Sequence, residues 1–240
     1  MKNRTSALLF WFVVLACSMA AAQDSTVLTA ENPIALAKVE GRMDHLSIDV
    51  KGQRLFVTAF TNNTIEVLDL KTRRQVHTIP DLDEPQGAFY DPDTNRLFVA
   101  CGGDGTVKIF DGTTYRLLQT VKLSSDSDNV RYDARAKHIV VGYGGEKFLA
   151  GKVSRPGGDG ALAILDLTGK KVGEIAMDAH PESFQLEKTG TRVFVNVPDH
   201  QEVEVADLVK GTVVARWPVT CTTNFPMALD EAHHRLFVGC

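Results

Sequence analysis

Seven polar residues, grouped at five places along the chain, have side chains suited to binding a ligand or a metal ion together. They are Asp44, His45, Gln86, Asp128, Asn129, Glu182 and Asn224. Carboxylate and amide oxygens suit cations such as Ca²⁺ and Mn²⁺, and an imidazole nitrogen suits Zn²⁺. Asp128 and Glu182 are the predicted metal ligands of this set. That chemistry requires five distant segments to meet at one place.

A repeat in the sequence indicates how they meet. The run RLFV begins at residues 54, 96 and 235, with the related runs HIVV at 138 and RVFV at 192, so that the intervals are 42, 42, 54 and 43 residues. A period of roughly 40 to 50 residues is typical of solenoids and propellers. An acidic residue stands five positions before each run, and its regular recurrence predicts a role in turns. These acids are Asp49, Asp91, Asp133, Glu187 and Asp230.

Each run is followed by two further apolar stretches, such as TIEVLDL and RRQVHTI in the first repeat. The stretches are short, rich in β-branched residues and bounded by Gly, Asn and Asp, as strands are. None has a sustained 3.6-residue period, so almost no helix is expected. Four strands in each repeat is the pattern of a propeller blade, and RLFV suits a strand buried on both faces between blades. The expected fold is all-β, a β-propeller with four-stranded blades.

The repeat also predicts where the seven polar residues lie. Strands of a blade run outward from the axis, so the loop that enters each innermost strand lies at the mouth of the central channel. The five groups occupy these loops, and neighbouring repeats differ there. Divergence at matched positions favours a ligand-binding rim. The alternative is a solvated rim in which Asp and Asn side chains stabilise turns.

The segments RLFVTAFTNNTIEVLDLKT (54–72) and RLFVACGGDGTVKIFDGTT (96–114) resemble the YVTN-type repeats of bacterial, YncE-like propellers. The resemblance covers Ile34 to the C-terminus and implies a ring of about seven blades. Five repeats are visible, and the last stops at Cys240 within its second strand, so we expect a fragment of that ring. A five-bladed ring with an incomplete last blade is the alternative. PIALAKVE (33–40) resembles the outermost strand that closes such a ring.

The resemblance favours a non-catalytic platform that binds a small molecule, peptide or protein at the channel mouth. The alternative is a metal-dependent hydrolase of lactonase type, because the oxygen-rich rim is similar to that of gluconolactonase propellers, where a metal polarises the lactone. Asp128 and Glu182 would then be the first metal ligands and His45 a base. Gln86 departs from the Asn that this family often has. A quinoprotein-like redox accessory is a third interpretation, and no cofactor motif supports it.

The third repeat carries about 13 extra residues within the segment GGEKFLAGKVSRPGGDG (144–160). The insert is expected on the same face as the channel mouth, between the second and third strands of its blade. Its basic residues Lys147, Lys152 and Arg155 predict a flexible lid over an acidic mouth, able to meet an anionic group of a ligand. An ordinary surface insertion is the alternative.

The N-terminus has the pattern of a secretory signal: Lys2 and Arg4, the apolar run ALLFWFVVLA (7–16), and small residues up to Ala22. The run is too short to span a bilayer. We expect residues 1–22 to be a signal peptide and 23–240 a propeller domain of a periplasmic or secreted bacterial protein. In the alternative, Cys17 carries a lipid anchor.

Three cysteines remain after that cleavage, and at least one of them is unpaired within the chain because their number is odd. They are predicted to be small core residues. They are Cys101, Cys221 and Cys240. The net charge of −4 and the absence of a basic run argue against a nucleic-acid partner.

Overall fold

The computed structural model describes residue 29 and residues 31–145, 148–149, 152–153 and 160–240. Ile34–Cys240 form one compact unit. The predicted signal peptide, Cys17 included, lies outside the described residues. Helix in the described part is confined to three 3₁₀ turns, and no helix there is long and apolar enough to cross a membrane. The turns are Phe60–Asn62, Pro198–His200 and Glu231–His233.

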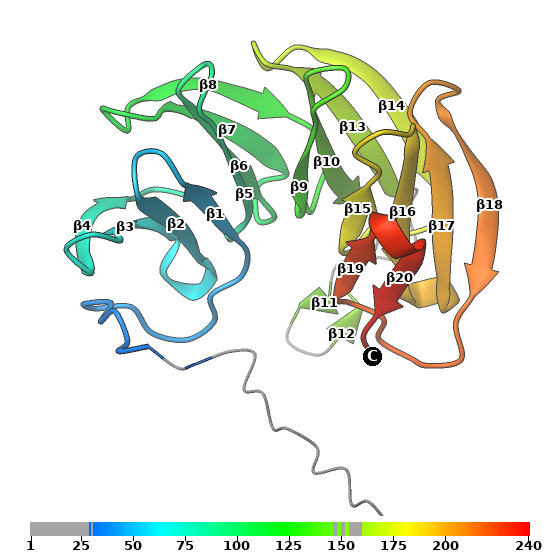
Figure 1. The fold of residues 1–240 in the computed structure, drawn as a ribbon, viewed down its shortest axis with the longest axis horizontal. Coiled ribbons are helices and arrows are strands. Elements are labelled where there is room, and N and C mark those ends of the chain that lie inside the picture. Colours follow the sequence, from blue (N-terminus) through cyan, green and yellow to red (C-terminus); the bar gives the residue numbers. More distant parts are fainter. Residues whose placement is uncertain (1–28, 30, 146–147, 150–151, 154–159) are drawn as a thin grey trace, which may run out of the picture. The chain divides into compact units, whose positions relative to one another are not determined.

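Strands consecutive in the sequence form four antiparallel four-stranded sheets and one further pair (Figure 1). The first sheet contains β1 (Leu46–Asp49), β2 (Arg54–Ala59), β3 (Thr64–Asp69) and β4 (Arg74–Ile79). The second contains β5 (Pro85–Asp91), β6 (Arg96–Cys101), β7 (Thr106–Asp111) and β8 (Leu117–Lys122). The third contains β9 (Val130–Asp133), β10 (His138–Gly144), β13 (Gly160–Asp166) and β14 (Lys171–Met177). The fourth contains β15 (Phe184–Leu186), β16 (Arg192–Val197), β17 (Glu202–Asp207) and β18 (Thr212–Pro218). The pair is β19 (Met227–Asp230) with β20 (Arg235–Val238), and a hairpin of β11 (Phe148–Leu149) and β12 (Lys152–Val153) lies in the insert.

The first strands of successive sheets are neighbours: β1 contacts β5, β5 contacts β9, β9 contacts β15, and β15 contacts β19. Each sheet is therefore one blade with its first strand innermost, and the chain is a β-propeller, as the repeat predicts. The runs RLFV, HIVV and RVFV form the second strand of every blade. In β6 and β16 all residues after the first are buried, in agreement with a strand covered on both faces.

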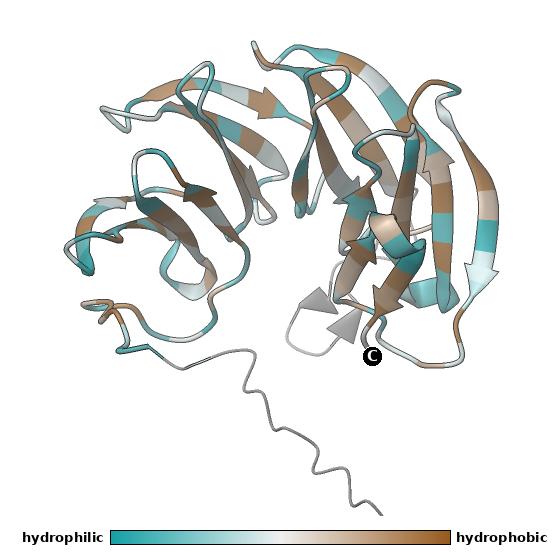
Figure 2. Ribbon diagram, viewed as in Figure 1, coloured by the Kyte–Doolittle hydropathy of each residue, from teal (hydrophilic) through white to brown (hydrophobic). Residues whose placement is uncertain are grey.

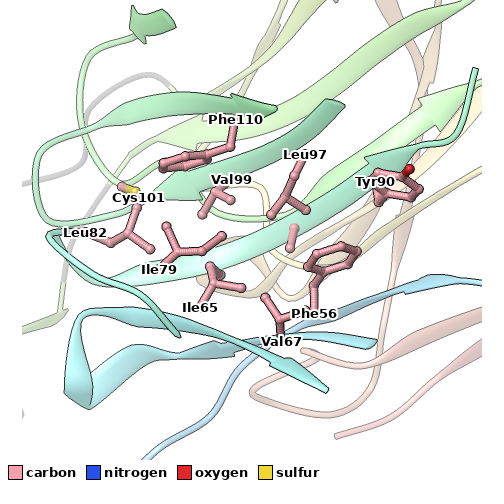
Figure 3. Packing of buried hydrophobic residues seen from close by; sticks show 11 residues of the cluster. Phe56, Ile65, Val67, Ile79, Leu82, Tyr90, Leu97, Val99, Cys101 and Phe110 are labelled. Atoms are coloured by element: carbon pink, nitrogen blue, oxygen red, sulfur yellow. The ribbon is translucent and has the colours of Figure 1, made fainter. Parts of the chain in front are cut away.

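The hydrophobic core lies between neighbouring blades. One cluster packs Phe56, Ile65 and Val67 of the first blade against Leu97 and Val99 of the second (Figure 3). Figure 2 shows apolar residues concentrated along the strands and hydrophilic residues in the connecting turns. Complete burial of a side chain of this size stabilises the fold by about 1.5 to 3 kcal/mol, so the repeated apolar run accounts for how the blades hold together.

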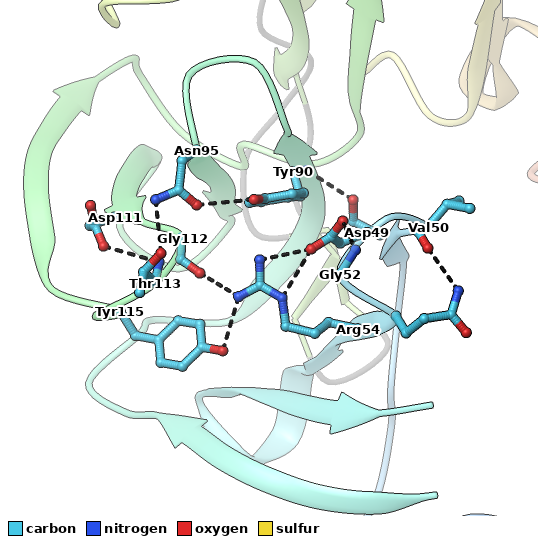
Figure 4. Close-up of polar contacts among 12 residues, drawn as sticks. Asp49, Val50, Gly52, Arg54, Tyr90, Asn95, Asp111, Gly112, Thr113 and Tyr115 are labelled. Atoms are coloured by element: carbon cyan, nitrogen blue, oxygen red, sulfur yellow. Dashed lines mark hydrogen bonds and ion pairs between the residues drawn. The ribbon is translucent and has the colours of Figure 1, made fainter. Parts of the chain in front are cut away.

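The acid that precedes each run stabilises the turn into it. Asp49 accepts a hydrogen bond from the backbone N–H of Gly52 (2.8 Å) and forms an ion pair with Arg54 (2.8 Å). Arg54 also donates to the Gly112 carbonyl and to the Tyr115 hydroxyl of the next blade (Figure 4). The other four acids likewise accept a backbone N–H from their own turn or the start of the run. The predicted turn role is confirmed.

Two predictions about the ends of the compact unit are wrong. Residues 33–40 form no strand, because a strand needs a hydrogen-bonding neighbour and no described strand pairs with them. Cys221 and Cys240 are not core residues. They form a disulfide with a Cα–Cα distance of 6.0 Å, since the loop before β19 and the segment after β20 come together. Cys101 is buried and free, as predicted.

Candidate functional site

A cavity of about 720 Å³ lies where the chain enters the innermost strands of the blades. Five of the seven predicted site residues line it, and they come from four different blades. They are Asp44, His45, Gln86, Asp128 and Glu182. The segment that leads into β19 closes one side with Phe225, Pro226 and Met227. The fold thus gathers at one place most of the residues that the repeat assigned to the channel mouth.

Equivalent backbone hydrogen bonds place three of the acids. In three blades the residue two positions before the innermost strand donates its N–H to a carbonyl of the second strand. The bonds run from Asp44 N to Thr58 O (3.0 Å), from Asp128 N to Gly142 O (2.9 Å) and from Glu182 N to Asn196 O (3.0 Å). Because the same bond recurs, the three carboxylates occupy the same repeat position and face one cavity.

Sequence reasoning missed a second set of residues, two positions earlier in the same three loops. Arg42, Asp126 and His180 also line the cavity. A signal was available, since these residues stand at a constant offset from Asp44, Asp128 and Glu182. The prediction considered only the residues that directly precede each strand.

His180 is the centre of the most buried part of the site. Its ring nitrogen Nδ1 is hydrogen-bonded to the Gly144 carbonyl, which leaves Nε2 facing the carboxylate of Asp128 at 3.7 Å. Nδ1 is also 4.0 Å from a carboxylate oxygen of Asp126. Gly145 takes a positive φ of 80° beside His180, and a Cβ there would lie 2.4 Å from the backbone nitrogen of His180. Glycine is therefore required for the close approach that holds the imidazole.

The crowding of charged groups changes their proton affinities. Burial and the Asp128 carboxylate raise the pKa of Glu182 to about 8. Burial alone would lower the pKa of His180, but the surrounding carboxylates, Asp128 foremost, raise it to about 10. Burial also opposes a charge on Asp128, yet the imidazoles of His180 and His45 hold the pKa of Asp128 below its usual value. Burial and Asp128 raise the pKa of Asp44.

His45 lies at the edge of the cavity between two carboxylates. Its Nε2 is 3.8 Å from Asp44 and 3.7 Å from Asp128, and it is hydrogen-bonded to the side-chain amide of Asn129 at 2.9 Å. Gln86 donates to Asp126 at 2.8 Å. Asn129 therefore supports His45 and does not line the cavity itself.

Asn224 lies apart from these residues. Its amide donates to the side chain of Asn196 (3.2 Å) and to the carbonyl of Glu202 (3.0 Å), so it ties the loop before β19 to the fourth blade. The repeat position of Asn224 was identified correctly, but its side chain bonds the neighbouring blade and is not among the residues that line the cavity.

Two arginines bring positive charge to the cavity wall. Arg42 pairs with Asp44 and lies over the ring of Phe60 at 4.6 Å. Arg131 lies over the ring of Phe184 at 5.9 Å, and burial lowers the pKa of its guanidinium. The predicted basic lid lies outside the part of the chain that the structure describes, as Lys147, Arg155 and the side chain of Lys152 do.

The residues fit a divalent cation at one point of the cavity. One ligand atom each from Asp128, His180 and Glu182 lies within 4.8 Å of the other two. Asp128 is 5% exposed, and its Oδ1 takes no hydrogen bond from any residue that the structure describes. A buried carboxylate oxygen without a donor is costly, and a cation would compensate it.

A second cluster of the same three residue types lies outside the cavity, at Asp178, His200 and Glu202. Asp178 is held by Arg216 through two hydrogen bonds of 2.6 and 2.9 Å. The side chains of Asp178 and His200 are 40% and 46% exposed. Beneath them Glu204 is fully buried, and burial raises the pKa of its carboxyl to about 7.

The fold and cavity define a β-propeller with a polar site at the entrance to its innermost strands. No protein-family model and no curated protein matches the sequence. Among solved structures the chain is similar to hydrazine synthase from Kuenenia stuttgartiensis, with a TM-score of 0.64 and 16% identity over 85% of this chain and 54% of that one. It is also similar to the computationally designed Ika8 protein, with a TM-score of 0.58 and 13% identity over 76% of this chain and 52% of that one. The chain spans about half the length of these structures, and at such identities the similarity shows the fold alone.

Proposed function

We propose that this chain is an exported, YncE-like β-propeller that binds a small cationic ligand in its polar cavity without converting it. The observation that carries the proposal is the divergence at matched repeat positions. One position holds Asp44, Gln86, Asp128 and Glu182 in four blades, and the position two residues earlier varies more, with Arg42, Glu84, Asp126 and His180. Repeat positions with a structural role keep one residue type, as the turn acids do. Positions that line a cavity and differ in charge suit a ligand with its own shape and charge.

The balance of charge in the cavity favours a cation. Among the described residues, five carboxyl groups line it, together with two guanidinium groups and two imidazoles. The carboxyl groups belong to Asp44, Glu84, Asp126, Asp128 and Glu182. Near pH 7 the pKa of about 8 keeps Glu182 largely protonated and the pKa of about 10 keeps His180 cationic, so the excess of carboxylates is small in the unliganded cavity. A cation that displaces these two protons enlarges that excess and is favoured by it. An anionic ligand would need to displace the carboxylates or bind through a bridging cation.

The environment of His45 favours binding over hydrolysis. A lactonase-type mechanism needs a base with a free lone pair facing the substrate. The Nε2 atom of His45 accepts a hydrogen bond from the side-chain amide nitrogen of Asn129 at 2.9 Å. That contact occupies the nitrogen that the hydrolase alternative assigns as the base, so binding without turnover is the function we propose.

Thermal unfolding of the purified protein tests this proposal. Spermidine and choline serve as organic cations, Mn²⁺ and Zn²⁺ as metal cations, and citrate as an anion. A ligand at 100 times its Kd stabilises by about 2.7 kcal/mol, a shift of a few degrees in a domain of this size. We expect at least one cation to raise the midpoint, and Asp44→Asn to reduce the rise while the exposed Asp178→Asn does not. If no cation raises the midpoint while citrate does, the proposed cation site is wrong.

The export part of the proposal has a separate test. Residues 1–22 carry the signal pattern, and cleavage after Ala22 leaves Gln23 as the first residue. We expect N-terminal sequencing of the protein recovered from a bacterial periplasm to begin at Gln23. A mature protein that begins at a lipid-modified Cys17 would replace the soluble form with an anchored one.

A further inference from the structure

We propose that Asp128, His180 and Glu182 form a mononuclear site for a transition-metal dication, of the Zn²⁺ or Mn²⁺ type. The proposed metal site rests on the proposed function in one respect, that the cavity binds a cation. It adds the kind of cation and the residues that bind it. The contacts that hold these three side chains support such a site.

His180 is held as metal-binding histidines are. Its Nδ1 is hydrogen-bonded to the Gly144 carbonyl, and its side chain is 9% exposed. A carbonyl accepts only, so Nδ1 keeps its proton, and Nε2 is the nitrogen that remains for a metal, which must displace the proton that pairs with Asp128 in the metal-free protein. A carbonyl that accepts a hydrogen bond from the other ring nitrogen fixes the tautomer and ring orientation of a metal-binding histidine in this way. Sequence position alone gave His180 no such role, since the prediction had assigned the imidazole of the site to His45.

Asp128 supplies an anionic oxygen that the protein leaves without a hydrogen bond. Its backbone N–H is bonded to Gly142 O at 2.9 Å, so the residue is anchored beside the strand that carries Gly144. Oδ2 lies 3.7 Å from His180 Nε2, whereas Oδ1 accepts no hydrogen bond in the described part of the chain. With 5% of the residue exposed, water does little to compensate that oxygen. A dication would.

The spacing of the three ligand atoms suits a metal with small side-chain adjustment. Ligands about 2.1 Å from a tetrahedral ion are separated from one another by roughly 3.4 Å. The distance from Asp128 Oδ2 to His180 Nε2 is 3.7 Å, and all three ligand atoms lie within 4.8 Å of one another. Glu182, whose backbone N–H donates to Asn196 O, is the least buried of the three.

The donor set selects among ions. One imidazole and two carboxylates suit Zn²⁺ or Mn²⁺, whereas Ca²⁺ takes six to eight oxygens, which three residues do not supply. Three protein ligands also leave coordination positions open toward the cavity. Arg131 lines the same cavity, so a bound ligand with an anionic oxygen would meet the metal and a guanidinium together.

Titration calorimetry of the purified protein, stripped with EDTA, tests the site, with Zn²⁺, Mn²⁺ and Ca²⁺ as probes. Co²⁺ is added as a spectroscopic substitute whose visible absorption reports nitrogen and oxygen ligation. We expect one Zn²⁺ or Mn²⁺ per chain, weaker Ca²⁺ binding, and a loss of about 1,000-fold in affinity, or about 4 kcal/mol, on Asp128→Asn. The second cluster offers matched controls, and Asp178→Asn and Glu202→Gln should change the affinity less than threefold.

Asp128→Asn could unfold the protein because Asp128 is buried, so Glu182→Gln is the second variant, at the least buried of the three residues. Circular dichroism checks that each variant is folded. Equal affinities in wild type, Asp128→Asn and Glu182→Gln would overturn the site, as would loss of binding in the Asp178→Asn control. If spermidine stabilises the protein and no transition metal binds, the metal site is wrong and the proposed function stands. If neither binds, both are wrong.

Discussion

Two clusters in this propeller contain the same three residue types, and they differ in almost every physical respect. Asp128, His180 and Glu182 line a cavity, and the first two have side chains only 7% and 9% exposed. Asp178 and His200 are 40% and 46% exposed. In the cavity a carboxylate oxygen has no hydrogen-bond donor, whereas Asp178 is held by Arg216.

The same three residue types therefore do not by themselves make a metal-binding site. A guanidinium already occupies the exposed cluster and repels a cation, and water competes for its carboxylates. In the cavity the low exposure removes water, and the imidazoles of His180 and His45 each lie 3.7 Å from the Asp128 carboxylate. The four predictions below test this difference, from the largest expected effect to the smallest.

The histidines of the two clusters should differ most in their contribution to stability. Replacing His180 by Gln leaves Asp128 buried without its cationic partner, and breaking a buried pair in this way costs about 3 to 5 kcal/mol. His200→Gln removes an exposed group that is 3.6 Å from Glu202, and should cost less than about 1 kcal/mol. Chemical denaturation at pH 7 in EDTA measures both. Equal losses would remove the distinction between the clusters.

The carboxyl of Glu204, beneath the exposed cluster, should make stability depend on pH. Burial raises its pKa from 4.5 to about 7, with Asp178 and Glu202 adding to the rise and Arg216 opposing it. The folded state then holds this proton more tightly than the unfolded state. The free energy of unfolding should therefore fall as pH rises from about 4.5 to about 7, by about 3 kcal/mol.

The variant Glu204→Gln isolates this effect from the other titrating groups. The amide carries no charge, and its oxygen still accepts the backbone N–H of Asp178, which is 3.2 Å from Glu204 in the wild type. As the pH rises from 5 to 8, Glu204→Gln should become increasingly more stable than the wild type. A constant difference across that range would contradict the raised pKa.

Glu66 occupies the same position in the third strand of the first blade as Glu204 in the fourth, and it should respond in the opposite direction. Its carboxylate accepts hydrogen bonds from Thr64 (2.6 Å), Gln75 and Thr78 (2.6 Å). In Glu66→Gln an amide nitrogen replaces one acceptor oxygen. The Gln75 amide nitrogen only donates, so the new amide must turn toward Thr64, whose hydroxyl then accepts instead of donating, at a cost of about 1 to 3 kcal/mol. Denaturation at pH 8 should show Glu66→Gln destabilised and Glu204→Gln stabilised.

The smallest effect is expected at the ion pair of the exposed cluster. Asp178 and Arg216 bond at 2.6 and 2.9 Å, yet both side chains are 40% exposed or more. Exposed pairs of this kind contribute about 0 to 1 kcal/mol. A double-mutant cycle with Asp178→Asn and Arg216→Gln should give a coupling within that range. A coupling above 2 kcal/mol would show that the cluster is more rigid and less solvated than its exposure indicates.

Local sequence patterns were sufficient to predict the β-propeller fold. The recurring RLFV run with an acid five residues ahead predicted the second strand of every blade, and short apolar stretches between turn residues predicted the others. These features depend on near neighbours: β-branched residues favour strands, and Asp49 caps a turn with Gly52 three residues away. The period then placed Asp44, His45, Gln86, Asp128 and Glu182 at the entrances of the blades, where the cavity has them.

The tertiary structure decided which side chains meet. His180 and Asp126 became site residues because loops of neighbouring blades converge, and Asn224 bonded to Asn196 of the adjacent blade. The Cys221–Cys240 disulfide follows from a contact between loops, and segment 33–40 is irregular because no described strand pairs with it; no local pattern encodes either feature. A strand is specified by the alternation of its own residues, whereas a site depends on the direction of side chains from segments about fifty residues apart. Repeat arithmetic predicts the position of such residues, and packing between blades determines their partners.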